Sequence, residues 1–135
     1  MRTRKKLSMK GPYTFEEWVR IYEERDDSKY VLEPGEQVCW DPEHGFFTFW
    51  YDARNKLLCI PKMCGNGRFW RKKIFEMAQA AGKKCVDGVY CCTKRDPKVY
   101  MRVLGGKLVK QEPAEKGRTI SYILISWDDT KEGRE

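Results

Sequence analysis

The sequence predicts a mixed α/β (α+β) domain in which short strands alternate with three helices. Three observations predict it: a helix-capping pattern before an aromatic stripe, several short aromatic and aliphatic runs after that stripe, and an apolar run that enters a glycine-paired turn before a second amphipathic helix. The 135 residues are 41% hydrophobic and 13% aromatic, which fits one domain with a well-filled core.

The chain starts with a basic leader over residues 1–12, which has no apolar run behind it and therefore predicts neither a signal peptide nor a membrane anchor. No segment approaches the roughly 18 apolar residues that a spanning helix needs, so we expect a soluble protein. Thr14 and Glu17 then form a capping box, and aromatic residues follow at helical spacing. We expect a helix from Thr14 to about Arg25 whose aromatic side is core.

Three strand-like runs come next, over residues 30–40, 45–51 and 56–61, with hairpin turns at 41–45 and 52–55 between them. The middle run is the most aromatic. This favours a central strand with two packed faces over the alternative, the wall of a substrate site.

Proline and glycine mark where the remaining helices begin and end. In order, we expect a helix over 68–84, a strand over 86–93, a short helix over 97–104 that starts with proline, and a hairpin of 108–110 with 119–127. We place the last strand at a sheet edge, where a second copy could pair. A single domain then spans 13–127, and residues 128–135 form a charged tail.

The main functional signal is the turn Cys64-Gly65-Asn66-Gly67, which opens the second helix. At a helix start about four N–H groups lack partners and the dipole is positive, so an anion can dock there. Glycines at 65 and 67 would let the backbone approach the anion with positive φ, while Lys62 and Arg68 add full charges. A tight connector without a ligand is the alternative.

The sequence excludes two well-known phosphate-binding motifs. Trp70 stands where a dinucleotide fingerprint needs its third glycine, and no Gly-Lys-Ser/Thr follows as a P-loop requires. We therefore expect a pyrophosphate turn of another kind. The basic residues Arg68, Arg71 and Lys72 either face the anion or form a solvated helix side.

The six cysteines predict neither a disulfide framework nor a zinc site, because several fall in strand-like runs, no Cys-x-x-Cys pair occurs and His44 is the only histidine. We expect reduced, mostly buried thiols in a cytosolic protein. Cys64 is the exception, since a helix N-terminus would stabilise its thiolate.

The order of elements over residues 14–127 resembles the GCN5-related N-acetyltransferase family, and Lys62-x-x-Gly65-x-Gly67 is similar to that family's Arg/Gln-x-x-Gly-x-Gly/Ala motif. The resemblance implies a central mixed, mostly antiparallel sheet with helices on both faces, and acetyl-coenzyme A as acyl donor. It implies these cofactor-binding residues: Leu58 and Ile60 for the pantetheine arm, and Lys62, Cys64, Gly65, Asn66, Gly67 and Arg68 for the pyrophosphate.

The departures from the family concern catalysis. Lysine replaces arginine or glutamine at 62, and the family's tyrosine acid has no clean counterpart, which leaves Tyr100 as candidate acid. An oxyanion donor is expected near Ile60. Glu43, His44 and Asp52 are candidate bases, with ordinary turn residues as the alternative reading.

The sequence leaves three functions open. The first is acetyl transfer to an amine-bearing small molecule or protein. The second is a non-catalytic binder on the same scaffold, since such compact chains resemble small bacteriophage proteins that act on a host or virion partner, in the bacterial cytoplasm or the virion. The third is a basic nucleic-acid module, which the formal charge of +7 and pI of about 9.1 permit. No membrane partner is expected.

Overall fold

The computed structural model describes residues 10–126. The first nine residues of the predicted leader, and the predicted tail, lie outside the described residues. Those described form three α-helices, one short 3-10 helix and seven strands: α1 (Phe15–Asp26), β1 (Gln37–Asp41), β2 (Gly45–Asp52), β3 (Leu57–Ile60), β4 (Met63–Gly65), α2 (Gly67–Ala81), β5 (Gly88–Thr93), α3 (Pro97–Leu104), β6 (Lys107–Pro113), η1 (Glu115–Gly117) and β7 (Thr119–Ser126).

The sheet is mixed and mostly antiparallel, as predicted. Its strand order is β1-β2-β3-β5-β7-β6, β4 pairs with β2, and only β3 and β5 run parallel. Strand β7 lies between β5 and β6, so the prediction that it forms an edge is wrong. The outer strand is β6, which is longer than predicted because its exposed polar residues hide the strand pattern.

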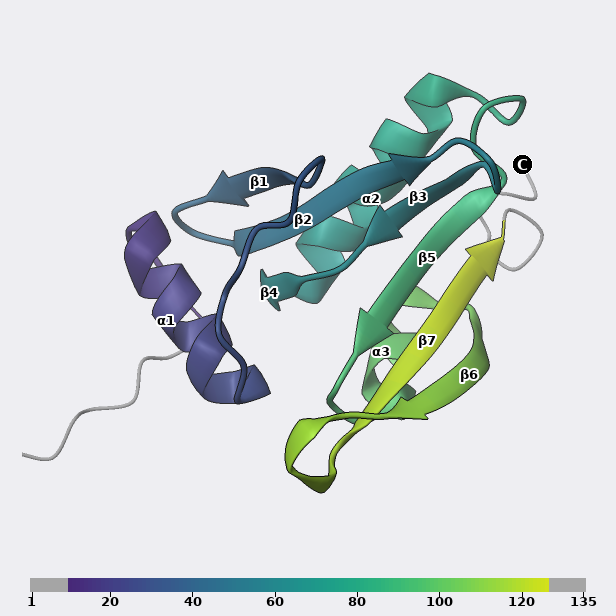
Figure 1. Cartoon of the computed structure of the whole chain (residues 1–135). Coiled ribbons are helices and arrows are strands. Elements are labelled where there is room, and N and C mark those ends of the chain that lie inside the picture. The colour runs from purple at the N-terminus through teal and green to yellow at the C-terminus, as the bar shows by residue number, and fades with distance from the viewer. Residues whose placement is uncertain (1–9, 127–135) are drawn as a thin grey trace, which may run out of the picture.

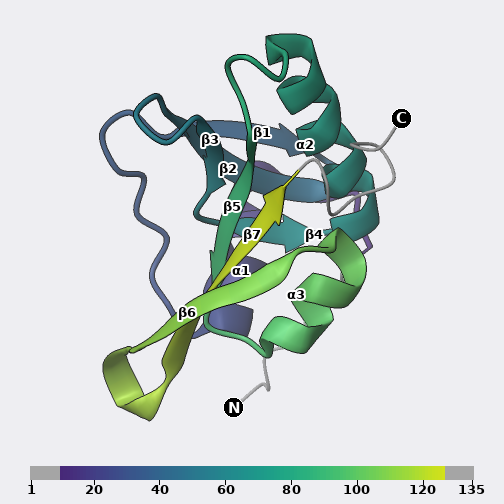
Figure 2. The ribbon, with the colours of Figure 1, turned by 90° about the vertical axis from the view of Figure 1, so that its right-hand side faces the viewer.

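Helices cover both faces of this sheet (Figure 2). On one face α2 and α3 pack on the larger core, where Trp70, Ile74 and Phe47 are buried. On the other face α1 packs Trp18 against Phe46 and β4. Neighbours Phe46 and Phe47 thus point into different cores, which confirms β2 as a strand with two packed faces.

Local signals place the helices well. The capping box at Thr14 and Glu17 is present, with both reciprocal hydrogen bonds, and α1 ends at Asp27 in the left-handed region. Helix α3 has the predicted bounds. Helix α2 ends at Ala81, three residues earlier than expected, because Gly82 takes a φ of 88°.

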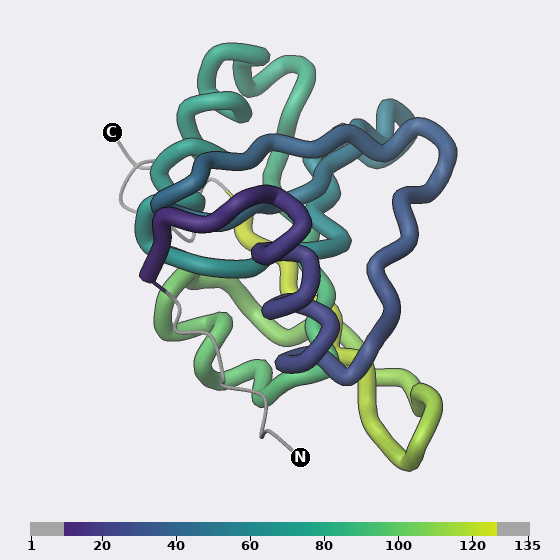
Figure 3. The backbone as a smooth tube through the Cα atoms, turned by 90° about the vertical axis from the view of Figure 1, so that its left-hand side faces the viewer, coloured from purple at the N-terminus to yellow at the C-terminus, as the bar shows by residue number. Residues whose placement is uncertain are grey.

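Two strand predictions are corrected. Residues 30–36, the first part of the strand predicted over 30–40, form no strand: they run along one side of the molecule to β1 (Figure 3), with a turn at Glu33–Glu36 where Gly35 has a φ of 84°. The predicted turn before α2 instead contains a strand, β4. It forms because β2 offers a second partner beyond the end of β3.

Candidate functional site

The candidate site lies where two strands diverge. Strands β3 and β5 pair in parallel from Leu57–Gly88 to Ile60–Cys91. Beyond Ile60 the chain turns away through Pro61 and continues as β4 beside β2, whereas β5 continues beside β7 (Figure 1). Leu58 and Ile60 therefore lie inside the sheet with β5 along them. This corrects the expectation that their backbones pair with a pantetheine arm.

The open strand edge begins in β4, at Met63, three residues after Ile60. The Lys62 carbonyl accepts from the Thr48 amide at 3.0 Å and the Asn66 amide donates to the His44 carbonyl at 2.8 Å. Because pairing alternates along an antiparallel strand, the amides and carbonyls of Met63 and Gly65 point away from β2. No partner for them occurs within residues 10–126.

That open edge borders a cavity of about 160 Å³. Strand β4, Gly67 at the start of α2 and the inner side of α3 line it, together with Arg25 and Arg95. Of the predicted cofactor-binding residues, the structure thus brings Cys64, Gly65 and Gly67 together, with candidate acid Tyr100 among them. Arg68 lies next to this group, exposed on the first turn of α2.

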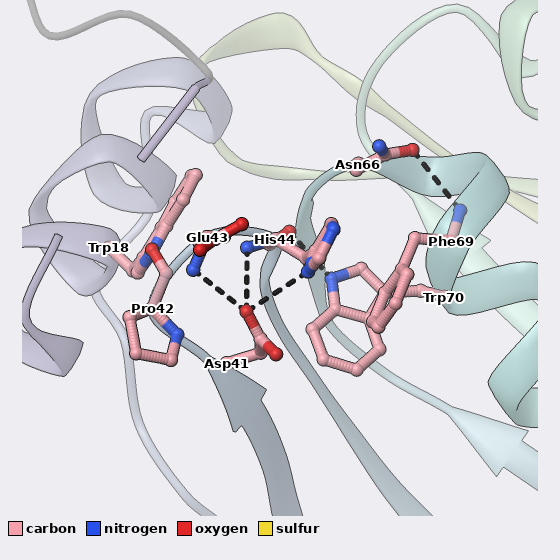
Figure 4. A network of polar contacts seen from close by, with 8 residues as sticks. All are labelled: Trp18, Asp41, Pro42, Glu43, His44, Asn66, Phe69 and Trp70. Atoms are coloured by element: carbon pink, nitrogen blue, oxygen red, sulfur yellow. Dashed lines mark hydrogen bonds and ion pairs between the residues drawn. The ribbon is translucent and has the colours of Figure 1, made fainter. Parts of the chain in front are cut away.

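The start of α2 has fewer free amides than the sequence suggested. The Asn66 side chain caps the helix, its Oδ1 accepting from the Phe69 amide at 3.1 Å (Figure 4), and the Asn66 amide is already bonded to His44. In the described part of the chain, only the Gly67 and Arg68 amides of this first helical turn lack a partner. An anion here would meet two backbone donors.

Gly65 serves a close crossing of two backbones. It lies opposite Gly45, and a Cβ at either position would come within 2.0 Å of a carbonyl oxygen on the other strand. Its φ is 109°, as expected for a glycine-dependent turn. Gly67 has no positive φ, which corrects that part of the prediction; a Cβ there would meet Val103 at 3.1 Å.

Lys62 points away from the cavity. Its Nζ lies 2.7 Å and 3.0 Å from the two carboxylate oxygens of Glu36. Burial alone would raise the pKa of Glu36, but hydrogen bonds, that of Lys62 foremost, outweigh burial and lower it. The expectation that Lys62 holds a phosphate is therefore wrong: strand alternation puts it on the side opposite Met63.

Cys64 is no thiolate. Its Sγ donates to the Trp18 carbonyl at 3.8 Å, in the core beneath α1. Burial raises the pKa of this thiol to about 12, so the predicted stabilisation by the helix N-terminus does not occur. The other five cysteines range from buried, as at Cys59 and Cys91, to exposed at Cys85.

The β1–β2 turn is a structural brace (Figure 4). Asp41 Oδ1 accepts from the amides of Glu43 and His44 and lies 3.0 Å from His44 Nδ1. The His44 ring stacks on Phe69 at 3.6 Å between centroids. Phe69 is about 200° around the helix from Gly67. The His44 ring thus lies on the side of α2 away from the cavity, and neither Glu43 nor His44 lines the cavity, which speaks against both as bases.

Asp52 also lies outside the site. Its carboxylate accepts from the amide and side chain of Asn55 in the β2–β3 turn. This turn is at the other end of β2 from Gly45, about 23 Å along the strand. The hairpin therefore carries Asp52 away from the cavity, which contradicts its expected catalytic role.

Tyr100 is half-buried and reaches the cavity from α3. Burial raises its pKa, so the phenol stays protonated at neutral pH. No hydrogen bond to its hydroxyl occurs within the described residues. Tyr100 thus brings a protonated hydroxyl to the cavity, and its role as the acid stays a prediction.

Arg25 and Arg95 also line the cavity, although neither was predicted as a site residue. They come from the end of α1 and the β5–α3 loop, and α1 reaches that loop only across the folded sheet. No pattern in the sequence signals this approach, because it depends on contacts between residues about seventy positions apart.

The sequence matches no protein-family model and none of the curated proteins compared. Among solved structures, nourseothricin acetyltransferase superposes with a TM-score of 0.56 at 15% identity, covering 73% of this chain and 69% of that one. An acetyltransferase from Thermus thermophilus superposes with a TM-score of 0.53 at 12% identity, covering 87% and 95%.

The chain has a GCN5-related N-acetyltransferase fold. The open β4 edge borders the cavity, and β4 follows the point where strands β3 and β5 diverge. No helix among the described residues has the length and apolar character to cross a bilayer.

Proposed function

We propose that this protein transfers the acetyl group of acetyl-coenzyme A to an amine, borne by a small molecule or a protein. The observation that carries the proposal is the open edge of β4 at Met63 and Gly65, which lines a cavity leading to the uncapped amides of α2. Such an edge can pair with the amides of a pantetheine arm as with an added strand.

The remaining cofactor contacts follow from this placement. The amides of Gly67 and Arg68, with the Arg68 guanidinium, are assigned to the diphosphate. The thioester oxygen is assigned to the Met63 amide, an open donor beyond the end of the β3–β5 pairing, rather than to a donor near Ile60 as the sequence suggested.

The chemistry then requires little else. The neutral amine attacks the thioester carbon, the C–S bond breaks, and the thiolate of coenzyme A takes a proton from the Tyr100 hydroxyl, which regains one from the acetylated nitrogen. Among the described residues no carboxylate lines the cavity. The acceptor must therefore arrive deprotonated, and this same lack of a base supports the non-catalytic binder as second candidate.

The test compares ligand binding with turnover. Acetyl-coenzyme A should raise the unfolding temperature by a few degrees, because it binds only the folded state. Val99→Trp, which fills the cavity from α3, should abolish that shift. Val109→Trp, at a similarly exposed position on β6, is the matched control and should keep it.

Coenzyme A release with amine acceptors decides between the two candidates. Tyr100→Phe should still bind acetyl-coenzyme A but release coenzyme A about a hundredfold more slowly. Binding by the wild type without release with any amine would favour the binder. No thermal shift for the wild type would remove the acetyltransferase assignment and leave the non-catalytic binder.

A further inference from the structure

The cavity is lined by residues that belong to both faces of the sheet. Met63 packs with the core beneath α2 and α3, whereas its neighbour Cys64 belongs to the core beneath α1. Both line the cavity, and so do Gly67 on the α2 side and Arg25 on α1. The lining thus extends from the start of α2 at one end to the end of α1 at the other.

The end beside α1 is cationic. Arg25 is exposed in the last turn of α1, and its guanidinium, which lies in the field of Asp26, makes no hydrogen bond or ion pair within residues 10–126. The Arg95 guanidinium lies 4.0 Å from Asp26 Oδ1, the outer limit of an ion pair. The described lining holds both guanidinium groups and no carboxylate.

Asp26 does not balance this charge. Its carboxylate also lies in the field of Arg118 and Lys94, so several cations share it. Arg118 itself donates to the Asp26 and Lys94 carbonyl oxygens, which ties the β6–β7 hairpin to the end of α1 (Figure 3). The framework around Arg25 and Arg95 is therefore fixed, and their charge remains available to a ligand in the cavity.

We propose that the acceptor amine carries a carboxylate or phosphate group, which Arg25 and Arg95 bind at the α1 end of the cavity. Planar guanidinium groups bind such anions in paired, charge-assisted hydrogen bonds. This inference rests on the proposed function, since that assigns the cofactor diphosphate to the other end, beside α2. The anion would hold the acceptor with its amine towards the thioester.

The experiment uses matched amines that differ in the anionic group. Binding of L-lysine and cadaverine, and of phosphoethanolamine and ethanolamine, is measured by calorimetry on protein saturated with coenzyme A. At least one amine that carries the carboxylate or phosphate group should bind about tenfold or more tightly than its counterpart that lacks this group. Which pair shows the difference tells carboxylate from phosphate.

Variants assign the preference to the two arginines. Arg25→Gln with Arg95→Gln should abolish it, whereas Arg20→Gln, an exposed position on the same helix outside the cavity, should keep it. Equal binding of both members of each pair, or no binding, overturns the inference. So does weaker coenzyme A binding by the double variant, because the arginines would then serve a cofactor phosphate.

Coenzyme A binding by the wild type is measured first. If it is absent, the proposed function fails. If it is present without a preference among the amines, only the inference fails.

Discussion

At the scale of single residues, Lys62 and Glu36 form a nearly buried ion pair, with side-chain exposures of 11% and 2%. Desolvation makes such pairs weak sources of stability, yet removing one partner is costly because the other charge stays buried. The Glu33 amide adds a hydrogen bond of 2.8 Å to the same carboxylate. The pair fixes the loop before β1 to the start of β4.

Lys62→Met should lower the free energy of unfolding at pH 7 by about 3 kcal/mol, since Glu36 keeps its buried charge without a partner. Chemical denaturation measures this loss. Lys73→Met, which removes an exposed ion pair with Glu76, should change stability by less than about 0.5 kcal/mol. Equal effects of the two substitutions would contradict the structural role of the pair.

The same pair predicts a pH dependence. In the folded protein the pKa of Glu36 lies below its ordinary value of 4.5. Its ionised form is thus favoured by folding, so the stabilisation is complete at neutral pH and is lost as the pH falls below about 4.5. In Lys62→Met this acid-dependent loss should be smaller, because the hydrogen bond that most lowers the pKa is gone.

At the scale of elements, the first turn of α2 has to serve both the helix and a ligand. Asn66 Oδ1 satisfies the Phe69 amide, and this leaves the Gly67 and Arg68 amides for an anion. The cap therefore belongs to the helix rather than to the cofactor.

Asn66→Ala should lower the free energy of unfolding by about 1 kcal/mol, because the Phe69 amide loses its partner. Acetyl-coenzyme A should bind within about twofold of the wild type. The amides assigned to the ligand are those of Gly67 and Arg68, and the substitution leaves both unchanged. Denaturation and calorimetry measure the two quantities, with Asn66→Ser as the uncharged control that keeps the cap. A loss of affinity much larger than the loss of stability would show that the Asn66 side chain contacts the ligand.

At the scale of the whole molecule, the sequence predicts what short-range signals encode. The Thr14 capping box and Pro97 mark their helices because each acts within one turn. The positions of the Lys62 and Arg25 side chains depend on residues 26 or more positions away. Lys62 pairs with Glu36, and Arg25 meets the β5–α3 loop at the cavity. The turn at 64–67 was therefore predicted as a ligand site, while the open β4 edge and the cationic end of the cavity required the folded sheet.

The net charge of +7 raises the question of nucleic acid for the molecule as a whole. The basic residues at the start of α2 are Arg68, Arg71, Lys72 and Lys73, and two of them are engaged within the protein. Arg71 Nε donates to the Leu104 carbonyl and its guanidinium covers Phe75, while Lys73 pairs with Glu76. Within this cluster only Arg68 and Lys72 remain exposed without such contacts in the described part. This favours a compact anion over a long polyanion.

The salt dependence of binding distinguishes acetyl-coenzyme A from nucleic acid as the ligand. Raising the salt concentration from about 50 to 200 mM should weaken acetyl-coenzyme A binding by less than about tenfold, since few charges are paired and part of the site is enclosed. A duplex that engages six or more phosphates would lose about a thousandfold over this range. Calorimetry with acetyl-coenzyme A and anisotropy with a labelled duplex give the two slopes. Tight, steeply salt-dependent duplex binding that excess coenzyme A leaves unchanged would assign the positive charge to nucleic acid instead.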